Sequence, residues 1–63
     1  MYTTEIVMIE DCSQVGPIFF SGSCAHEQYK TVTEARKAAE AWASQKGLTK
    51  GTYKIISRIV GCL

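Results

Sequence analysis

The amino-acid sequence predicts a small α+β fold, in which a three-stranded antiparallel sheet carries one helix on one face. A length of 63 residues with 46% hydrophobic residues suits a single globular domain, residues 1–63. Residues 31–48 show the periodicity of an amphipathic helix. Residues 2–10, 17–23 and 52–60 are rich in β-branched and aromatic residues, as strands are. The predicted element order is therefore β-β-α-β.

The helix has a recognisable beginning and end. Thr31 and Glu34 have the spacing of a capping box, in which the hydroxyl accepts from the Glu34 N–H and the carboxylate accepts from the Thr31 N–H. Gly47 can adopt the left-handed conformation that ends a helix, and Leu48 is then placed against Ala43. The apolar face between these ends, which we expect to cover the sheet, consists of Val32, Ala35, Ala39, Trp42 and Ala43.

The three strands follow from the segments around the helix. Residues 2–10 carry apolar groups on both alternating faces, which suits a central strand. Residues 11–16 have the composition of a turn, and Pro17 begins the second strand, where no ladder donor is needed. A hairpin makes the first two strands antiparallel, and the helix returns the chain so that the third strand also pairs with the first. We expect the sheet order 2-1-3; the alternative, 1-2-3, requires a parallel pair and a right-handed crossover.

One helix covers only one face of such a sheet. The residues expected to meet the helix are Ile6, Met8, Ile18, Phe20, Tyr53, Ile55 and Ile59. The opposite face would form a patch of the kind that marks a contact site, unless a β-bulge shifts part of the set. We predict that its partner-binding residues are Val7, Ile9, Phe19, Ile56 and Val60 at the apolar centre, with Lys54 and Arg58 at the rim.

The cysteines and the histidine are candidate ligands of a metal site. Cys12, Cys24, Cys62 and His26 are the residue types of a Cys₃His zinc site, but no C-x-x-C pair is present and the hairpin separates Cys12 from the others. A half-site shared across a dimer and a Cys24–Cys62 disulfide stay open alternatives, and small thiols without a ligand are the simplest interpretation. A Cys24–His26 nucleophile would need an orienting group and a cleft. We therefore predict no metal, no cofactor and no enzymatic activity.

The charge pattern bears on partners and on location. A net charge of +1 argues against strong whole-chain attraction to nucleic acid or to a membrane, although the last 36 residues hold all seven basic residues. Neither a signal peptide nor a membrane span is recognisable, so we expect a cytoplasmic protein. Nucleic-acid binding is the alternative function, with Phe19 stacking on bases while Lys54 and Arg58 hold phosphates.

A family resemblance adds a more specific expectation. The run TVTEARKAAEAWASQKG, residues 31–47, followed by GTYKIISRIV, residues 51–60, resembles small phage-encoded accessory proteins. Such proteins often bind and block a host protein, so the resemblance implies an inhibitor that acts in the host cytoplasm. Together with the uncovered sheet face, it predicts a non-enzymatic, homodimeric module that binds itself or a larger protein target.

Overall fold

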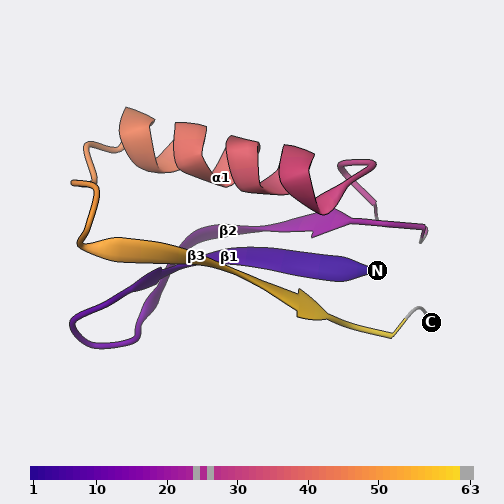
Figure 1. Ribbon diagram of the computed structural model, residues 1–63, viewed down its shortest axis with the longest axis horizontal. Coiled ribbons are helices and arrows are strands. Elements are labelled where there is room, and N and C mark those ends of the chain that lie inside the picture. Colours follow the sequence, from indigo (N-terminus) through magenta and orange to yellow (C-terminus); the bar gives the residue numbers. More distant parts are fainter. Residues whose placement is uncertain (24, 26, 62–63) are drawn as a thin grey trace.

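The computed structural model describes residues 1–23, 25 and 27–61, and it confirms the predicted α+β class (Figure 1). Its elements in chain order are β1 (Tyr2–Met8), β2 (Gln14–Ser21), α1 (Val32–Gln45) and β3 (Tyr53–Ile59). The sheet order is β2-β1-β3 with both pairs antiparallel, so the predicted order 2-1-3 is confirmed and the order 1-2-3 is excluded. Figure 1 shows α1 lying along one face of the sheet, and no described element covers the other face.

The N-terminus of α1 is capped almost as the sequence predicts. The Thr31 hydroxyl accepts a hydrogen bond from the Glu34 N–H at 3.2 Å. The Glu34 carboxylate accepts from the N–H of Lys30 at 3.1 Å, one residue earlier than a capping box requires. The carboxylate still satisfies a backbone donor at the positive end of the helix dipole.

The C-terminus of α1 forms the expected Schellman motif. The Leu48 N–H donates to the Ala43 carbonyl at 2.9 Å, and the Gly47 N–H donates to the Ser44 carbonyl at 3.1 Å. Gly47 has φ 77°, the left-handed region that glycine occupies without a Cβ clash. This motif reverses the chain toward β3.

The hairpin loop between β1 and β2 lies earlier in the chain than predicted, at residues 9–13 rather than 11–16, so Pro17 lies inside β2 and not at its first residue. β1 ends at Met8, and β2 begins at Gln14. The Met8 N–H donates to the Ser13 carbonyl at 2.8 Å, and the Cys12 N–H donates to the Met8 carbonyl at 3.0 Å. Asp11 accepts from the Ser13 hydroxyl at 2.7 Å and from its N–H at 3.1 Å, and these bonds hold the pKa of the Asp11 carboxyl below its usual value. The turn therefore uses a side chain to satisfy its own backbone.

The core lies between α1 and the sheet and is built around small helix residues. Ala35, Ala39 and Ala43 are 0% exposed and pack with Ile6 and Phe19. Alanine lets the helix backbone approach the strands closely, so a few large side chains fill the remaining space. The half-buried residues around this cluster are Val15, Tyr29, Ala38, Trp42, Leu48, Tyr53 and Ile55.

Trp42 fixes the helix against β2. Gly16 has φ 76°, and a Cβ built on it would lie 2.8 Å from Cη2 of the Trp42 ring. No side chain larger than hydrogen fits there while the ring stays in place. Gly16 thus allows the left-handed backbone conformation at this point of β2, and it leaves room for the ring of Trp42, the largest side chain of the helix.

Polar side chains lie in the buried layer beside the apolar cluster. Thr4 and Ser21 are 0% exposed, and Thr4 Oγ1 lies 3.1 Å from the Ser57 hydroxyl. Arg36 of α1 donates to the same Ser57 oxygen at 3.4 Å. The Ser21 hydroxyl has no hydrogen-bond partner within the described ranges. This part of the interior is thus polar and small rather than hydrophobic, which limits the stability that burial supplies.

The register of β2 contradicts part of the predicted face assignment. Phe19 lies opposite Thr4, and Val15 lies opposite Ile6, so both share the helix side of the sheet. Phe19 is 8% exposed and belongs to the core, so its expected place on the uncovered face was wrong. Ile18, expected against the helix, alternates with Phe19 and lies on the uncovered face.

Two features explain this error. β2 carries apolar side chains on both of its faces, so hydropathy does not determine which set faces the helix. A shift of one residue in the assignment exchanges the two faces. The register also shifts between Thr4 and Ile6, where one residue of β1 lies opposite residues 16–18 of β2. Phe20, also expected against the helix, lies opposite Thr3 on the uncovered face.

Of the other five residues expected to meet the helix, three belong to the core or pack against it, as predicted: Ile6, Tyr53 and Ile55. Met8 is half-buried and lies outside the core cluster. Ile59 is 78% exposed, and its placement under the helix was wrong, because it pairs with the exposed Tyr2 at the end of the sheet.

The close approach of α1 to the sheet gives a test by overpacking. Ala39→Leu inserts a larger side chain where the native one is 0% exposed, and we expect it to lower the free energy of unfolding by about 1–3 kcal/mol. Ala41→Leu, on the exposed side of the same helix, is the matched control and should change stability by less than about 0.5 kcal/mol. Urea denaturation followed by circular dichroism measures both. Equal stability of the two variants would contradict the described packing.

Candidate functional site

The sheet face opposite α1, here called the open face, mixes apolar and charged side chains. Residues paired across neighbouring strands share a face, so the register identifies its members. Thr3 lies between Phe20 and Arg58, and Val7 lies between Gln14 and Lys54. With alternation along each strand, the apolar members of the open face are Val7, Ile9, Ile18, Phe20, Ile56 and Val60.

The apolar members of the open face are unequally accessible. Ile9 and Ile18 are the most exposed, at 52% and 40%. Phe20, Ile56 and Val60 are half-buried. Val7 lies on the predicted face, yet it is 6% exposed, because β1 is the central strand and its neighbours flank it on both sides. A partner would therefore touch mainly the outer parts of this face.

The charges of the open face are partly paired. Arg58 Nε lies 3.6 Å from a carboxylate oxygen of Glu5, with side-chain exposures of 63% and 17%. An ion pair this open to solvent stabilises the fold by about 0.2–1 kcal/mol. Lys54 is exposed and has no ion-pair partner among the described residues. The open face therefore has one paired and one unpaired cation at its β3 side.

Phe19, the predicted site residue that the structure places elsewhere, holds the loop before α1. Its ring centroid lies 6.0 Å from that of Tyr29, with a tilt of 53°. The Tyr29 N–H donates to the Phe20 carbonyl at 3.0 Å, and the Gly22 N–H donates to the Tyr29 carbonyl at 3.3 Å. Phe19 is thus a structural residue that seats this loop along the outer side of β2.

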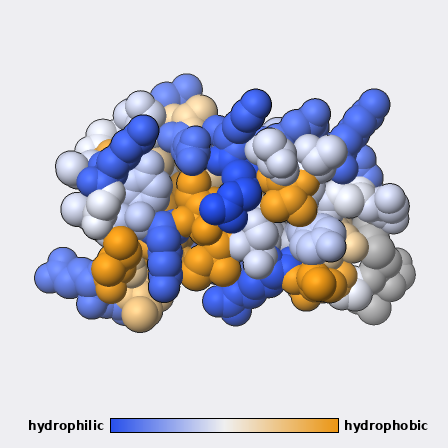
Figure 2. Space-filling view, in the orientation of Figure 1, coloured by the Kyte–Doolittle hydropathy of each residue, from blue (hydrophilic) through white to orange (hydrophobic). Residues whose placement is uncertain are grey.

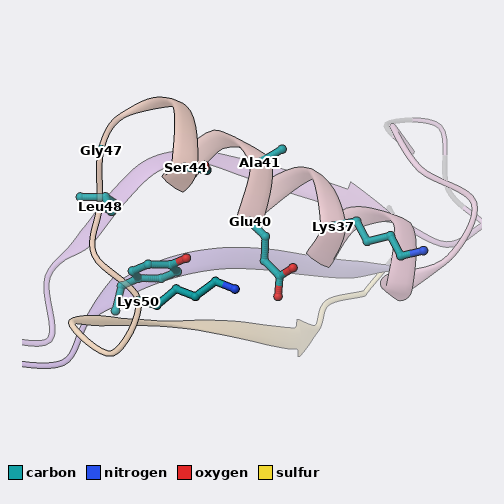
Figure 3. A pocket seen from close by; sticks show the side chains of 8 residues that line it. Lys37, Glu40, Ala41, Ser44, Gly47, Leu48 and Lys50 are labelled. Atoms are coloured by element: carbon teal, nitrogen blue, oxygen red, sulfur yellow. The ribbon is translucent and has the colours of Figure 1, made fainter.

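A second surface feature, which the sequence did not reveal, lies between α1 and β3. A hollow of about 520 Å³ and an adjoining one of about 280 Å³ share Glu40, Lys50 and Tyr53 in their walls. We call them together the α1–β3 groove. Figure 3 shows Glu40 reaching from α1 toward the sheet and Lys50 extending from the connection toward Glu40. The remaining lining residues are Arg36, Lys37, Ala41, Ser44, Gly47, Leu48, Gly51, Lys54 and Ile55.

The groove is basic because the helix and the connection to β3 place cations on the same side of the sheet. Arg36 and Lys37 come from α1 and Lys50 comes from the connection, while Lys54 borders the second hollow at β3 and belongs to the open face by its register with Val7. Glu40 is the acidic residue that lines it. The spacing of Arg36, Lys37 and Glu40 on the helix was visible in the sequence. Only the fold shows that the connection brings Lys50 beside them and that β3 brings Lys54 to the border of the groove.

The described residues provide few side chains of the kinds that catalyse reactions or bind metal ions. Residues 1–23, 25 and 27–61 contain no cluster of three His, Cys, Asp or Glu side chains able to hold a metal ion. Cys12 is exposed in the hairpin and has φ 60°. Cys24, His26 and Cys62 lie outside the described residues, so the shared half-site and the disulfide stay open alternatives.

Two further findings concern membrane-spanning helices and similarity to known proteins. α1, the helix within the described ranges, has 14 residues and is neither long nor apolar enough to cross a membrane. Comparison of the chain with protein-family models, with curated proteins and with solved structures gave no match. The open face and the α1–β3 groove are therefore the features from which we infer function.

The assignment of Phe19 to the core and of Ile18 to the open face can be tested by a pair of truncations. Phe19→Ala removes a side chain that is 8% exposed, and we expect it to lower the free energy of unfolding by about 3–5 kcal/mol. Ile18→Ala removes one that is 40% exposed and should cost less than about 1 kcal/mol. Thermal and urea unfolding measure both changes. A larger loss for Ile18→Ala would show that the phase of β2 is the reverse.

Proposed function

We propose that this chain is a non-enzymatic protein-binding module that presents the open face to a protein partner. The observation that carries the proposal is the unequal covering of the sheet: α1 packs on one side, while Ile9 and Ile18 stay 52% and 40% exposed on the other. Contact with water is unfavourable for such apolar surface, and burial against a partner removes it.

The composition of the open face suits a protein more than a nucleic acid. An apolar centre with an aromatic residue and a charged rim is the usual anatomy of a protein interface. Phe20 and the cations Lys54 and Arg58 could serve a nucleic acid, but Glu5 lies 3.6 Å from Arg58 and would repel phosphates. Nucleic-acid binding is therefore the weaker alternative.

The partner is either a second copy of the chain or a larger protein. Two open faces packed against each other would form a homodimer with a sandwich of two sheets, which cover one another at about 10 Å separation. Binding to a larger target protein would instead block the part of the target's surface that the module covers. That second form corresponds to the inhibitory role implied by the resemblance to phage-encoded accessory proteins.

The proposal predicts a difference between two isoleucines on opposite faces. A photo-crosslinking amino acid in place of Ile18 should form specific adducts, with a second copy or with a larger protein, in the cells that express the chain. The same replacement at Ile59, which is 78% exposed on the helix side of the sheet, is the matched control and should form none of these adducts.

Introduction of a charge on either face gives the complementary measurement. Ile18→Glu should abolish the adducts seen from a crosslinker at Ile9, because a buried carboxylate without a partner is costly. Ile59→Glu should leave them unchanged. Absence of adducts from Ile9 and Ile18, or salt-sensitive binding of mixed DNA and RNA oligonucleotides that Ile18→Glu abolishes, would contradict the proposal.

A further inference from the structure

The outer edge of β3 has free hydrogen-bonding groups. β3 is an edge strand, and in the described part of the chain it pairs only with β1. The Val60 N–H donates to the Met1 carbonyl at 2.9 Å, and the Thr52 carbonyl accepts from the Ile9 N–H at 3.0 Å. Because inward and outward groups alternate along an antiparallel strand, the backbone groups of Tyr53, Ile55, Ser57 and Ile59 point away from the sheet.

The opposite edge of the sheet is protected, which makes the two edges unequal. The Phe20 carbonyl of β2 accepts from the N–H groups of Gln28 and Tyr29, both at 3.0 Å. The Gln28 side chain accepts from the Phe20 N–H at 3.2 Å, and Pro17 has no N–H to offer. β3 has no such cover among the described residues. An unpaired edge of this kind is a template for another strand.

Cations flank the free edge on both sides of the sheet. On the helix side, the α1–β3 groove brings Arg36, Lys37 and Lys50 beside β3, and Arg36 reaches Ser57 at 3.4 Å. On the open-face side, Lys54 and Arg58 extend from β3 itself; Arg58 is paired with Glu5 at 3.6 Å, and Lys54 has no ion-pair partner among the described residues. Figure 2 shows hydrophobic side chains enclosed by hydrophilic ones on this side of the molecule, where β3 runs below α1 in Figure 1.

We propose that the free edge of β3 binds an acidic peptide segment in extended conformation, as a fourth strand of the sheet. The side chains of an added strand alternate between the two sides, so half of them meet the groove and half meet Lys54, Ile56 and Arg58. Carboxylates on the groove side lie near three cations, Arg36, Lys37 and Lys50, which outnumber the one carboxylate of Glu40 among the lining residues. The main-chain bonds supply affinity, and the cations select acidic residues.

The same charges argue against a second copy at this edge. Antiparallel pairing of two β3 edges centred on Ile56 would bring Lys54 of one copy opposite Arg58 of the other. Like charges opposite each other destabilise a strand pair. The edge is therefore suited to a partner of opposite charge, and it lies apart from the apolar open face proposed above.

The test uses three blocked synthetic peptides of nine residues and the intact protein. In the first, Glu alternates with Val; in the second, Lys replaces Glu; the third repeats the first with N-methyl groups on the amides that would pair with β3. We expect only the first to bind, and we expect it to slow hydrogen exchange at the amides of Tyr53, Ile55 and Ser57. The amides of Lys54, Ile56 and Arg58, which bond to β1, are the internal reference.

Charge reversal identifies the cations that select the peptide. Lys37→Glu with Lys50→Glu should weaken binding of the acidic peptide at least tenfold, as measured by fluorescence anisotropy at low salt. Lys30→Glu with Lys46→Glu makes the same change of net charge outside the groove and should change the affinity less than twofold. Ile18→Glu, on the open face, should leave the affinity unchanged, so failure here is distinguishable from failure of the proposed function.

Several outcomes would overturn the proposal. Equal binding of the N-methylated peptide would show electrostatic attraction without strand addition. Equal binding of the Lys peptide, or no effect of the double reversal, would remove the charge argument. Binding of a single-stranded oligonucleotide in the groove, without binding of the acidic peptide, would assign the cations to phosphates instead.

Discussion

The close contact between the alanine face of α1 and the sheet is the interaction on which the rest of the structure depends. Ala35, Ala39 and Ala43 are fully buried, so the helix backbone lies near β1 and only Ile6 and Phe19 are needed to complete the cluster. The Schellman motif and the capped N-terminus hold the helix at the length of the strands it covers. A core of this size leaves little reserve of stability, as expected for so short a chain.

Because the core is formed by a single helix on one face of the sheet, it determines which surfaces stay available for partners. A single helix seated on β1 and β2 leaves the other face of the sheet uncovered, and β3 has no described neighbour on its outer side. The open face exposes isoleucine, whereas the edge of β3 exposes backbone groups among cations. These two surfaces differ in chemistry, so they suit different partners, one apolar and one acidic and extended.

The sequence predicted the elements and their order more reliably than the faces. Capping signals at Thr31 and Gly47 and the two-sided apolar pattern of β1 were local, and each was confirmed. Phe19 was misplaced because its neighbours Ile18 and Phe20 are also apolar, so hydropathy leaves the phase of β2 undetermined. The α1–β3 groove depends on Lys50 and Lys54 meeting residues of the helix, which only the tertiary fold shows.

Solvent accessibility of the isoleucine methyl groups tests most directly whether the open face is uncovered. A soluble paramagnetic chelate added to methyl-labelled protein at low concentration should broaden the signals of Ile9, Ile18 and Ile59 strongly and that of Ile6 least. Protection of Ile9 and Ile18 that is lost on dilution would mean that a second copy covers the face. Protection that persists at every concentration, with Ile59 still accessible, would contradict the described fold of the free chain.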